Sequence, residues 1–217
     1  MIKIEHTEVS GWNAAIRGMR NPHDSWGKSD SYWTLIEDPE THQTARFEFF
    51  MGEEDMKLAK KLAKAGDDHG KFLRMIHVSC DIVAPLYWWK EFDTYKVGTV
   101  ANSCSTMHKI AAKEFTLDDF SHEHLTPLAV STLERVIDML ENYRADYTLT
   151  KAKEDWWQVI QLLPSSYNQR RTVQLNYQVL KSMYHARRNH KLDEWRDFCE
   201  WIESLPYFKE MCLEGMG

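Results

Sequence analysis

The sequence predicts a mostly helical α+β protein that forms one domain over residues 1–217. Apolar residues make up 43% of the 217 positions, which is enough material for a buried core. Several long segments repeat apolar residues at helical spacing, and a shorter one alternates with a period near two. No repeat, low-complexity tract or linker divides the chain.

The helices are predicted from their apolar faces and from the residues that end them. Glu53–Ala65 alternates apolar side chains with lysines, and Gly66 follows as a stop signal. Its lysines indicate a solvated face rather than a binding patch. By the same criteria helices are expected at Gly11–Met19, Leu86–Tyr95, Leu128–Tyr147, Asp155–Leu163, Thr172–Arg188 and Asp193–Leu205.

Strand signals are fewer. Phe72–Val83 is rich in β-branched residues and predicts a strand that Pro85 ends. Met1–Val9 begins with an alternating run typical of an edge strand, and Arg20–Asp30 is rich in turn formers and predicts a loop. The first fifty residues carry no indication of function.

Charge and cysteine content exclude several classes of protein. The formal charge is −6 with acidic and basic residues mixed, which disfavours binding to polymeric nucleic acid but leaves a single nucleotide possible. The four cysteines are widely spaced and indicate thiols in a reducing compartment. No signal peptide or membrane-spanning stretch is evident, so we expect a cytoplasmic protein with no membrane partner.

Two small constellations could carry chemistry, and each has a simpler interpretation. His122 and His124 could share a metal ion, but no third ligand stands at a recognised spacing, so no metal site is predicted. Cys104 and His108 lie four residues apart and would share a helical face as a thiolate–imidazolium pair. A packed thiol beside an unrelated histidine is the favoured interpretation of that pair.

Polar residues inside the predicted helix Thr172–Arg188 give a sharper signal. Asn176 and Gln178 interrupt an otherwise apolar run, and Arg187 lies within a cluster of guanidinium and imidazole groups. Arg187 could complement the dipole of its own helix or bind a phosphate in a bidentate clamp. Composition alone favours the first alternative.

The spacing of these residues resembles the C-terminal part of the flavin-dependent thymidylate synthases. That family carries a Leu-Pro, then a helix with an Asn-x-Arg-Ser-like start, then an arginine. Here Leu163-Pro164, Asn176 and Arg187 fall on that spacing, with Gln178 in place of the first arginine. The resemblance covers about Leu58 to Leu205.

The family's central block consists of a histidine-led loop, a strand, a helix and an Arg-His-Arg signature. The stretch from His69 to Lys109 resembles this block in length and in the spacing of its apolar residues. The signature itself is much altered. Thr94, Tyr95 and Lys96 replace its Arg-His-Arg, and its two serines fall at Thr99 and Cys104.

The resemblance implies a central antiparallel-type sheet flanked by long helices, and a homotetramer with shared flavin sites. It implies binding of FAD and deoxyuridine monophosphate (dUMP), with NADPH and folate as co-substrates in a methyl-transferring reaction that forms dTMP. Arg187, Lys96 and Cys104 would bind dUMP. Asn176, His69, Thr99 and Gln178 would bind the cofactor.

Two alternatives follow from the altered signature. The chain could keep the fold as a non-enzymatic nucleotide-binding or assembly module. It could instead be an enzyme of altered chemistry that uses Cys104.

Overall fold

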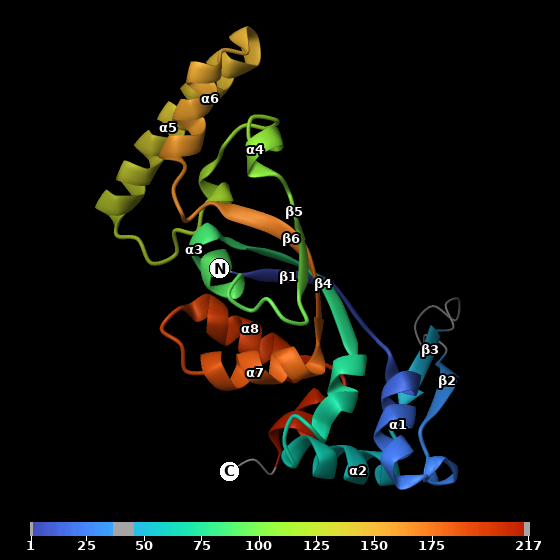
Figure 1. Cartoon of the computed structure of the whole chain (residues 1–217). Helices are drawn as coiled ribbons and strands as arrows, with labels where there is room; N and C mark the ends of the chain where they lie inside the picture. The colour runs from blue at the N-terminus through green and yellow to red at the C-terminus, as the bar shows by residue number, and fades with distance from the viewer. Residues whose placement is uncertain (1, 37–45, 215–217) are drawn as a thin grey trace.

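The computed structural model describes residues 2–36 and 46–214. Strands and helices are interspersed along the chain, together with short 3₁₀ or π turns (η) (Figure 1). In chain order the elements are β1 (Lys3–Ser10), α1 (Trp12–Arg20), η1 (Asn21–His23), η2 (Trp26–Lys28), β2 (Tyr32–Ile36), β3 (Arg46–Phe50), α2 (Glu53–Lys64), η3 (Gly70–Met75), β4 (His77–Pro85), α3 (Leu86–Phe92), β5 (Val100–Ser103), α4 (Thr106–Lys109), η4 (Leu117–Asp119), α5 (Pro127–Thr150), α6 (Lys153–Leu162), β6 (Asn168–Asn176), α7 (Tyr177–Arg187), α8 (Asp193–Ser204) and η5 (Lys209–Leu213).

The main sheet has the order β1-β4-β6-β5, and every neighbouring pair is antiparallel. β1 pairs only with β4, so the predicted edge strand at the N-terminus is confirmed. On β4, Val78, Cys80 and Ile82 are buried, whereas the residues between them are more exposed. This alternation gives the sheet one apolar face, which the helices α3, α7 and α8 cover (Figure 1). The predicted α+β class with an antiparallel sheet is therefore confirmed.

The prediction of one helix over Thr172–Arg188 is wrong in its first part. Residues 168–176 form β6, which lies between β4 and β5, and the helix begins only at Tyr177. Val173 and Leu175 are buried while Thr172 and Gln174 are exposed, which is the period of a strand. Val173 faces Cys80 on one neighbour and Ala101 on the other, so tertiary pairing on both sides overrides the helical pattern.

The strand predicted at Phe72–Val83 begins later than expected. Residues 70–75 form the 3₁₀ turn η3, whose Phe72 and Leu73 are buried in the core, and β4 starts at His77. Pro85 ends β4 and stands as the residue before α3, as its fixed backbone angle favours. The following helix stops at Phe92, three residues before the predicted end.

Aromatic side chains fill the main core between the sheet and the helices. Trp88 packs against Trp89, Phe92, Trp195 and Phe198, with ring centroids 4.8–5.5 Å apart. All five are essentially excluded from solvent. These tryptophans thus join α3 to α8 within the chain.

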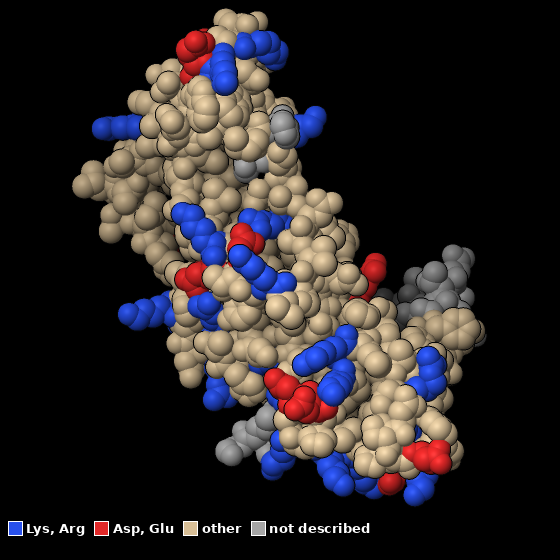
Figure 2. Space-filling view, viewed as in Figure 1, with Lys and Arg blue, Asp and Glu red and all other residues tan. Residues whose placement is uncertain are grey.

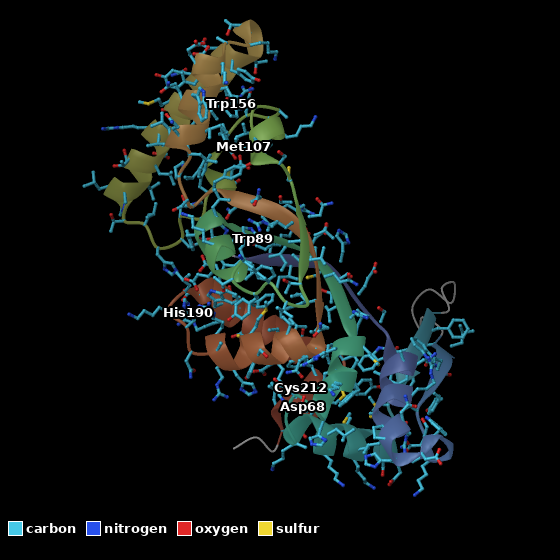
Figure 3. The ribbon with its side chains drawn as sticks, viewed as in Figure 1. Asp68, Trp89, Met107, Trp156, His190 and Cys212 are labelled. Carbon is cyan, nitrogen blue, oxygen red and sulfur yellow. The ribbon has the colours of Figure 1, made fainter. Side chains whose placement is uncertain are left out.

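Helices α5 and α6 form an arm that projects from the end of the sheet, as Figure 1 shows. The arm packs on a second, smaller core made of Ile110, Phe115, Phe120, Leu133, Ile137, Leu140 and Val159. Thr126 caps α5 by accepting the amide of Ala129, and Pro127 occupies the first turn. Trp156 donates its indole N–H to the carbonyl of Met107, which ties α6 to α4 (Figure 3).

The opposite end of the molecule contains α1, α2 and the antiparallel hairpin of β2 and β3. Sequence analysis predicted the two helices but not the hairpin. Trp33 pairs with Phe49 across this hairpin. Asp55 of α2 is fully buried and accepts the Nε–H of Arg20 at 2.5 Å.

Within the described residues no helix is long and apolar enough to cross a bilayer. Figure 2 shows charges of both signs interspersed on one face.

Candidate functional site

The start of α7 is fixed by Asn176, the last residue of β6. Its backbone is extended, and its side-chain Oδ1 accepts the amide hydrogen of Val179 at 3.0 Å. Asparagine is among the preferred residues for this capping role. Asn176 therefore has a structural role that its predicted place inside a helix did not suggest.

A cleft of about 430 Å³ opens beside this first turn of α7, and we call it the α7 cleft. Its polar and charged lining residues are Asp67, Arg74, Thr94, Tyr95, Lys96, Asn176, Gln178 and Ser182. The volume falls within the range of small-molecule sites. Two cations and the N-terminus of α7 give the cleft a chemistry suited to a phosphate.

Gly98 lets the chain after α3 approach the capping residue closely. Its φ is +74°, a region that favours glycine, and a Cβ atom there would lie 2.8 Å from Nδ2 of Asn176. The segment that carries Lys96 can therefore lie directly against the start of α7.

Gln178 is buried on the wall of the cleft. Its Nε2 donates to Asp67 at 2.8 Å, which fixes the orientation of the amide. Its Oε1 finds no hydrogen-bond partner among the described residues. A buried acceptor left without a partner costs about 1–3 kcal/mol, so a donor supplied by a bound molecule would be stabilised here.

Arg187 lies at the other end of α7, and its guanidinium is held by neighbouring side chains. Nη1 donates to Glu91 at 2.5 Å and Nε donates to the hydroxyl of Tyr95 at 2.9 Å. The guanidinium also stacks over Trp195, 4.7 Å from the ring centroid. Trp195 and His190 both contact the same Glu91 oxygen, at 3.0 and 3.4 Å. We call these five residues the Arg187 cluster; Figure 3 labels His190 between α7 and α8.

Cys104 lines a different cavity, of about 370 Å³, next to Lys109, Lys113, Tyr167, Gln169 and Arg170. Its backbone is fixed by two hydrogen bonds, one in each direction, to Arg170 and Gln169. Its thiol is exposed, whereas burial raises the pKa of Cys80 to about 12 and that of Cys199 to about 11. Pairing of Cys104 with His108 lies outside the described side chains.

The remaining predicted residues lie apart from the α7 cleft. His69 is exposed at the start of η3. Thr99 is half-buried and donates its hydroxyl hydrogen to the carbonyl of Tyr95. The structure thus brings together Lys96, Asn176 and Gln178 in the cleft, whereas His69, Thr99, Cys104 and Arg187 are not among its lining residues.

Sequence analysis missed Ser182 and Asp67 in the cleft and Glu91 as the partner of Arg187. Ser182 lies one helical turn after Gln178, so the helical period could have placed it on the same face. Glu91 is 96 residues away from Arg187 in sequence, and no local pattern joins them.

His122 and His124 each contact a neighbouring group of the protein. His122 pairs through Nδ1 with the carbonyl of Phe120 at 2.7 Å, and His124 contacts Asp193 at 2.9 Å. Among the described residues, no group of three His, Cys, Asp or Glu side chains is arranged to hold a metal ion.

No protein-family model matches the sequence, and no curated protein matches it. Solved structures do match. The flavin-dependent thymidylate synthase ThyX from Helicobacter pylori, complexed with FAD and dUMP, gives a TM-score of 0.67 at 14% identity over 98% of both chains. A second structure of ThyX from that organism with FAD and dUMP gives 0.67 at 14% identity, over 99% of this chain and 98% of that one.

The chain has the fold of the flavin-dependent thymidylate synthases. A third match has the same overall arrangement: the UMP/dUMP methylase PolB from Streptomyces cacaoi, bound with 5-Br UMP, gives a TM-score of 0.60 at 13% identity over 94% of this chain and 87% of that one. The structural likeness confirms the fold that the resemblance in sequence implied. At such low identity it establishes the fold and nothing further about chemistry.

Proposed function

We propose that this chain is a diverged, cytoplasmic relative of the flavin-dependent thymidylate synthases that binds FAD in the α7 cleft and a pyrimidine nucleotide such as dUMP beside it. The observation that carries the proposal is the set of polar groups in the cleft. Asn176 and Gln178, at the start of α7, meet there with Lys96 and Arg74, which come from distant segments of the chain. The known structures with this fold that hold FAD and dUMP support the choice of ligands.

The residues of the α7 cleft fit a flavin nucleotide. The unpartnered Oε1 of Gln178 can accept an N–H, and Nδ2 of Asn176 can donate to a carbonyl. Arg74 and Lys96 can bind phosphate oxygens. When bound, FAD would supply the hydride for methylation of dUMP, with folate as the one-carbon donor and NADPH as the source of reducing equivalents.

Titration of the purified protein with FAD tests this proposal. At about 100 μM FAD, some tenfold above an affinity of roughly 10 μM, the cofactor's visible absorbance should change and its fluorescence should fall. Gln178→Leu should abolish the change. Gln174→Leu is the matched control, since Gln174 is exposed on β6 and does not line the cleft. An unchanged spectrum with the parent protein would overturn the flavin assignment.

The nucleotide phosphate is assigned to Arg187, and this requires a phosphate to displace Glu91. Arg187→Ala should therefore weaken dUMP binding roughly ten- to a hundredfold. Glu91→Gln removes the competing carboxylate and should strengthen dUMP binding. Arg188→Ala is the matched control, because Arg188 is exposed one residue further on. Calorimetry on the four proteins decides, and equal affinities throughout would refute the assignment.

A non-enzymatic binding or assembly module is the second candidate, and the Arg187 cluster favours it. The guanidinium that would hold the phosphate already has a carboxylate, a phenol and an indole as neighbours. Under this candidate Glu91→Gln leaves dUMP binding unchanged, and FAD binding, if present, supports no methylation of dUMP.

Assembly into a homotetramer belongs to both candidates. Large apolar side chains are exposed on the α5–α6 arm, namely Leu128, Met139, Leu149, Trp157 and Leu162. Assembly of the chains would remove these apolar side chains from solvent. Light scattering at micromolar concentration should give four times the 25.7 kDa mass of one chain, and a monomer mass would exclude the assembly.

A further inference from the structure

A third cavity is lined by residues of β1, α1, the β2–β3 hairpin and the C-terminal segment. Figure 1 shows the hairpin and α1 at the end of the molecule opposite the α5–α6 arm. The cavity has a volume of about 670 Å³ and shares no residue with the α7 cleft. We call it the aromatic cavity, because five rings line it: Trp12, Trp33, Phe47, Phe49 and Tyr207.

The rings of the aromatic cavity present their faces in different directions. Trp12 and Phe49 are stacked, with centroids 4.9 Å apart and planes within 8° of each other. Tyr207 stands perpendicular to both, at 89° to Trp12 and 90° to Phe49. Trp33 is tilted by 59° against Phe49, at 5.4 Å. Such a set of rings forms a corner rather than a flat wall.

Hydrogen bonds and backbone conformation hold two of these rings in place. The hydroxyl of Tyr207 donates to the carbonyl of Phe49 at 3.0 Å and accepts the amide hydrogen of Met51 at 3.2 Å. The indole N–H of Trp33 donates to Asn13 at 2.8 Å. Tyr207 also has φ of +58°, a conformation that costs a non-glycine residue free energy and is enriched at functional sites. The polar atoms of both rings are thus already bonded within the protein, which fixes the two rings at the cavity wall.

The charged residues that line the aromatic cavity are of one sign. Glu48 and Glu210 are half-buried on its wall, and no lysine, arginine or histidine is among its described lining residues. Phe47 and Trp33 are 72% and 44% exposed, so two of the rings remain accessible from solvent. The carboxylate of Glu210 together with aromatic rings attracts positive charge, and the apolar rings favour a cation that carries alkyl groups over a strongly hydrated metal ion.

From this arrangement we propose that the aromatic cavity is a binding site for a small organic cation, of the quaternary ammonium or alkylated amine class. The rings stabilise the cation through their quadrupoles, and Glu210 supplies the counter-charge at the rim. The site is independent of the nucleotide chemistry proposed for the α7 cleft, because the two share no lining residue.

Calorimetric titration with choline chloride tests the proposal, in a phosphate buffer free of amines and at constant ionic strength. The parent protein should bind choline with an affinity of about 1 mM or tighter. The neutral isostere 3,3-dimethyl-1-butanol has the same shape without the charge, and it should bind at least about tenfold more weakly. Equal binding of the two compounds, or no binding of choline, overturns the proposal.

Two variants locate the site. Glu210→Gln should weaken choline binding about tenfold by removing the counter-charge, and Phe47→Leu about threefold by replacing a π face with an alkyl group. Phe47 is 72% exposed, so its replacement leaves the core intact. Trp157→Leu, an exposed aromatic on the α5–α6 arm, is the matched control and should bind like the parent. Choline affinity unchanged in both cavity variants would also refute the assignment.

Discussion

The two ends of α7 differ in how their polar groups are partnered. At the N-terminal end, Gln178 keeps a buried acceptor that has no partner among the described residues, and Asn176 faces an open cleft. At the C-terminal end, Arg187 donates to Glu91 and Tyr95 and stacks on Trp195. The first end thus has a buried acceptor left for a ligand, whereas the guanidinium at the second end already has a carboxylate, a hydroxyl and an indole ring as partners.

The comparison teaches that the position of a residue in a motif does not establish its availability. Asn176 and Arg187 both fall on the spacing of the thymidylate synthase family. Only the first lines a cleft. A bound phosphate would have to compete with Glu91, and an exchange of one anion for another gains much less than the binding of a free guanidinium.

The ion pair of Asp55 and Arg20 is buried, and we expect its loss to have the largest effect on stability. Asp55 also accepts hydrogen bonds from Ser29 and Ser31 at 2.8 and 2.6 Å. Asp55→Ala leaves a buried guanidinium without its partner and should lower the free energy of unfolding by about 3–5 kcal/mol in urea titrations. Glu54→Ala, which removes an exposed carboxylate of the same helix, should change it by less than about 0.5 kcal/mol.

The same pair predicts a dependence of stability on pH. Burial raises the pKa of Asp55, but hydrogen bonds from Ser31, Ser29 and Arg20 outweigh burial, so the net pKa is lowered from 3.8. The unfolded chain then binds this proton more readily, and the stabilisation present above pH 3.8 is lost as the pH falls through the folded-state value. The free energy of unfolding of the parent should fall in that acid range, and the free energy of unfolding of Asp55→Asn should fall less.

Substitution of Arg187, at the C-terminal end of α7, should have an intermediate effect on stability. Arg187→Ala breaks hydrogen bonds to Glu91 and Tyr95 and should cost about 1–2 kcal/mol of stability, since both partners are only partly buried. Arg188→Ala should cost almost nothing. If the two variants unfold alike, the Arg187 cluster does not stabilise the fold, and the contrast between the ends of α7 fails.

Substitution of Asn176, at the N-terminal end of α7, should have the smallest effect on stability. Asn176→Ala removes the cap of α7 and should cost about 1 kcal/mol. Asn176→Asp keeps an oxygen acceptor for the amide of Val179 and should restore most of that loss while it removes the Nδ2 donor. FAD binding that stays weak in Asn176→Asp would assign the amide nitrogen to the ligand, whereas full recovery of binding would assign Asn176 to capping alone.

Local patterns sufficed for much of the fold. The amphipathic run Glu53–Ala65 and the long apolar stripe from Leu128 correspond to α2 and α5, because each helix buries one face at helical spacing. They failed for residues 168–176, where pairing with two neighbouring strands decides the conformation. They could not reveal the β2–β3 hairpin, whose strands pair across a segment that lies outside the described residues.

The candidate site was predictable only where residues close in sequence share a turn. Asn176 and Gln178 flank the start of α7, so they are close in sequence, but the predicted helix would have pointed them to different sides. The contact of Arg187 with Glu91 and the orphaned oxygen of Gln178 depend on side chains brought together by the tertiary fold. Neither could be deduced from spacing alone.

The α5–α6 arm rests on a small core of its own, built around Leu133, Ile137, Leu140 and Val159. The arm can therefore detach from the sheet without disturbing the tryptophan-rich core. Local unfolding of this kind requires less free energy than global unfolding. Backbone amides of α5 and α6 should accordingly exchange their hydrogen for deuterium sooner than those of β4 and β6, through an opening in which the rest of the molecule stays folded.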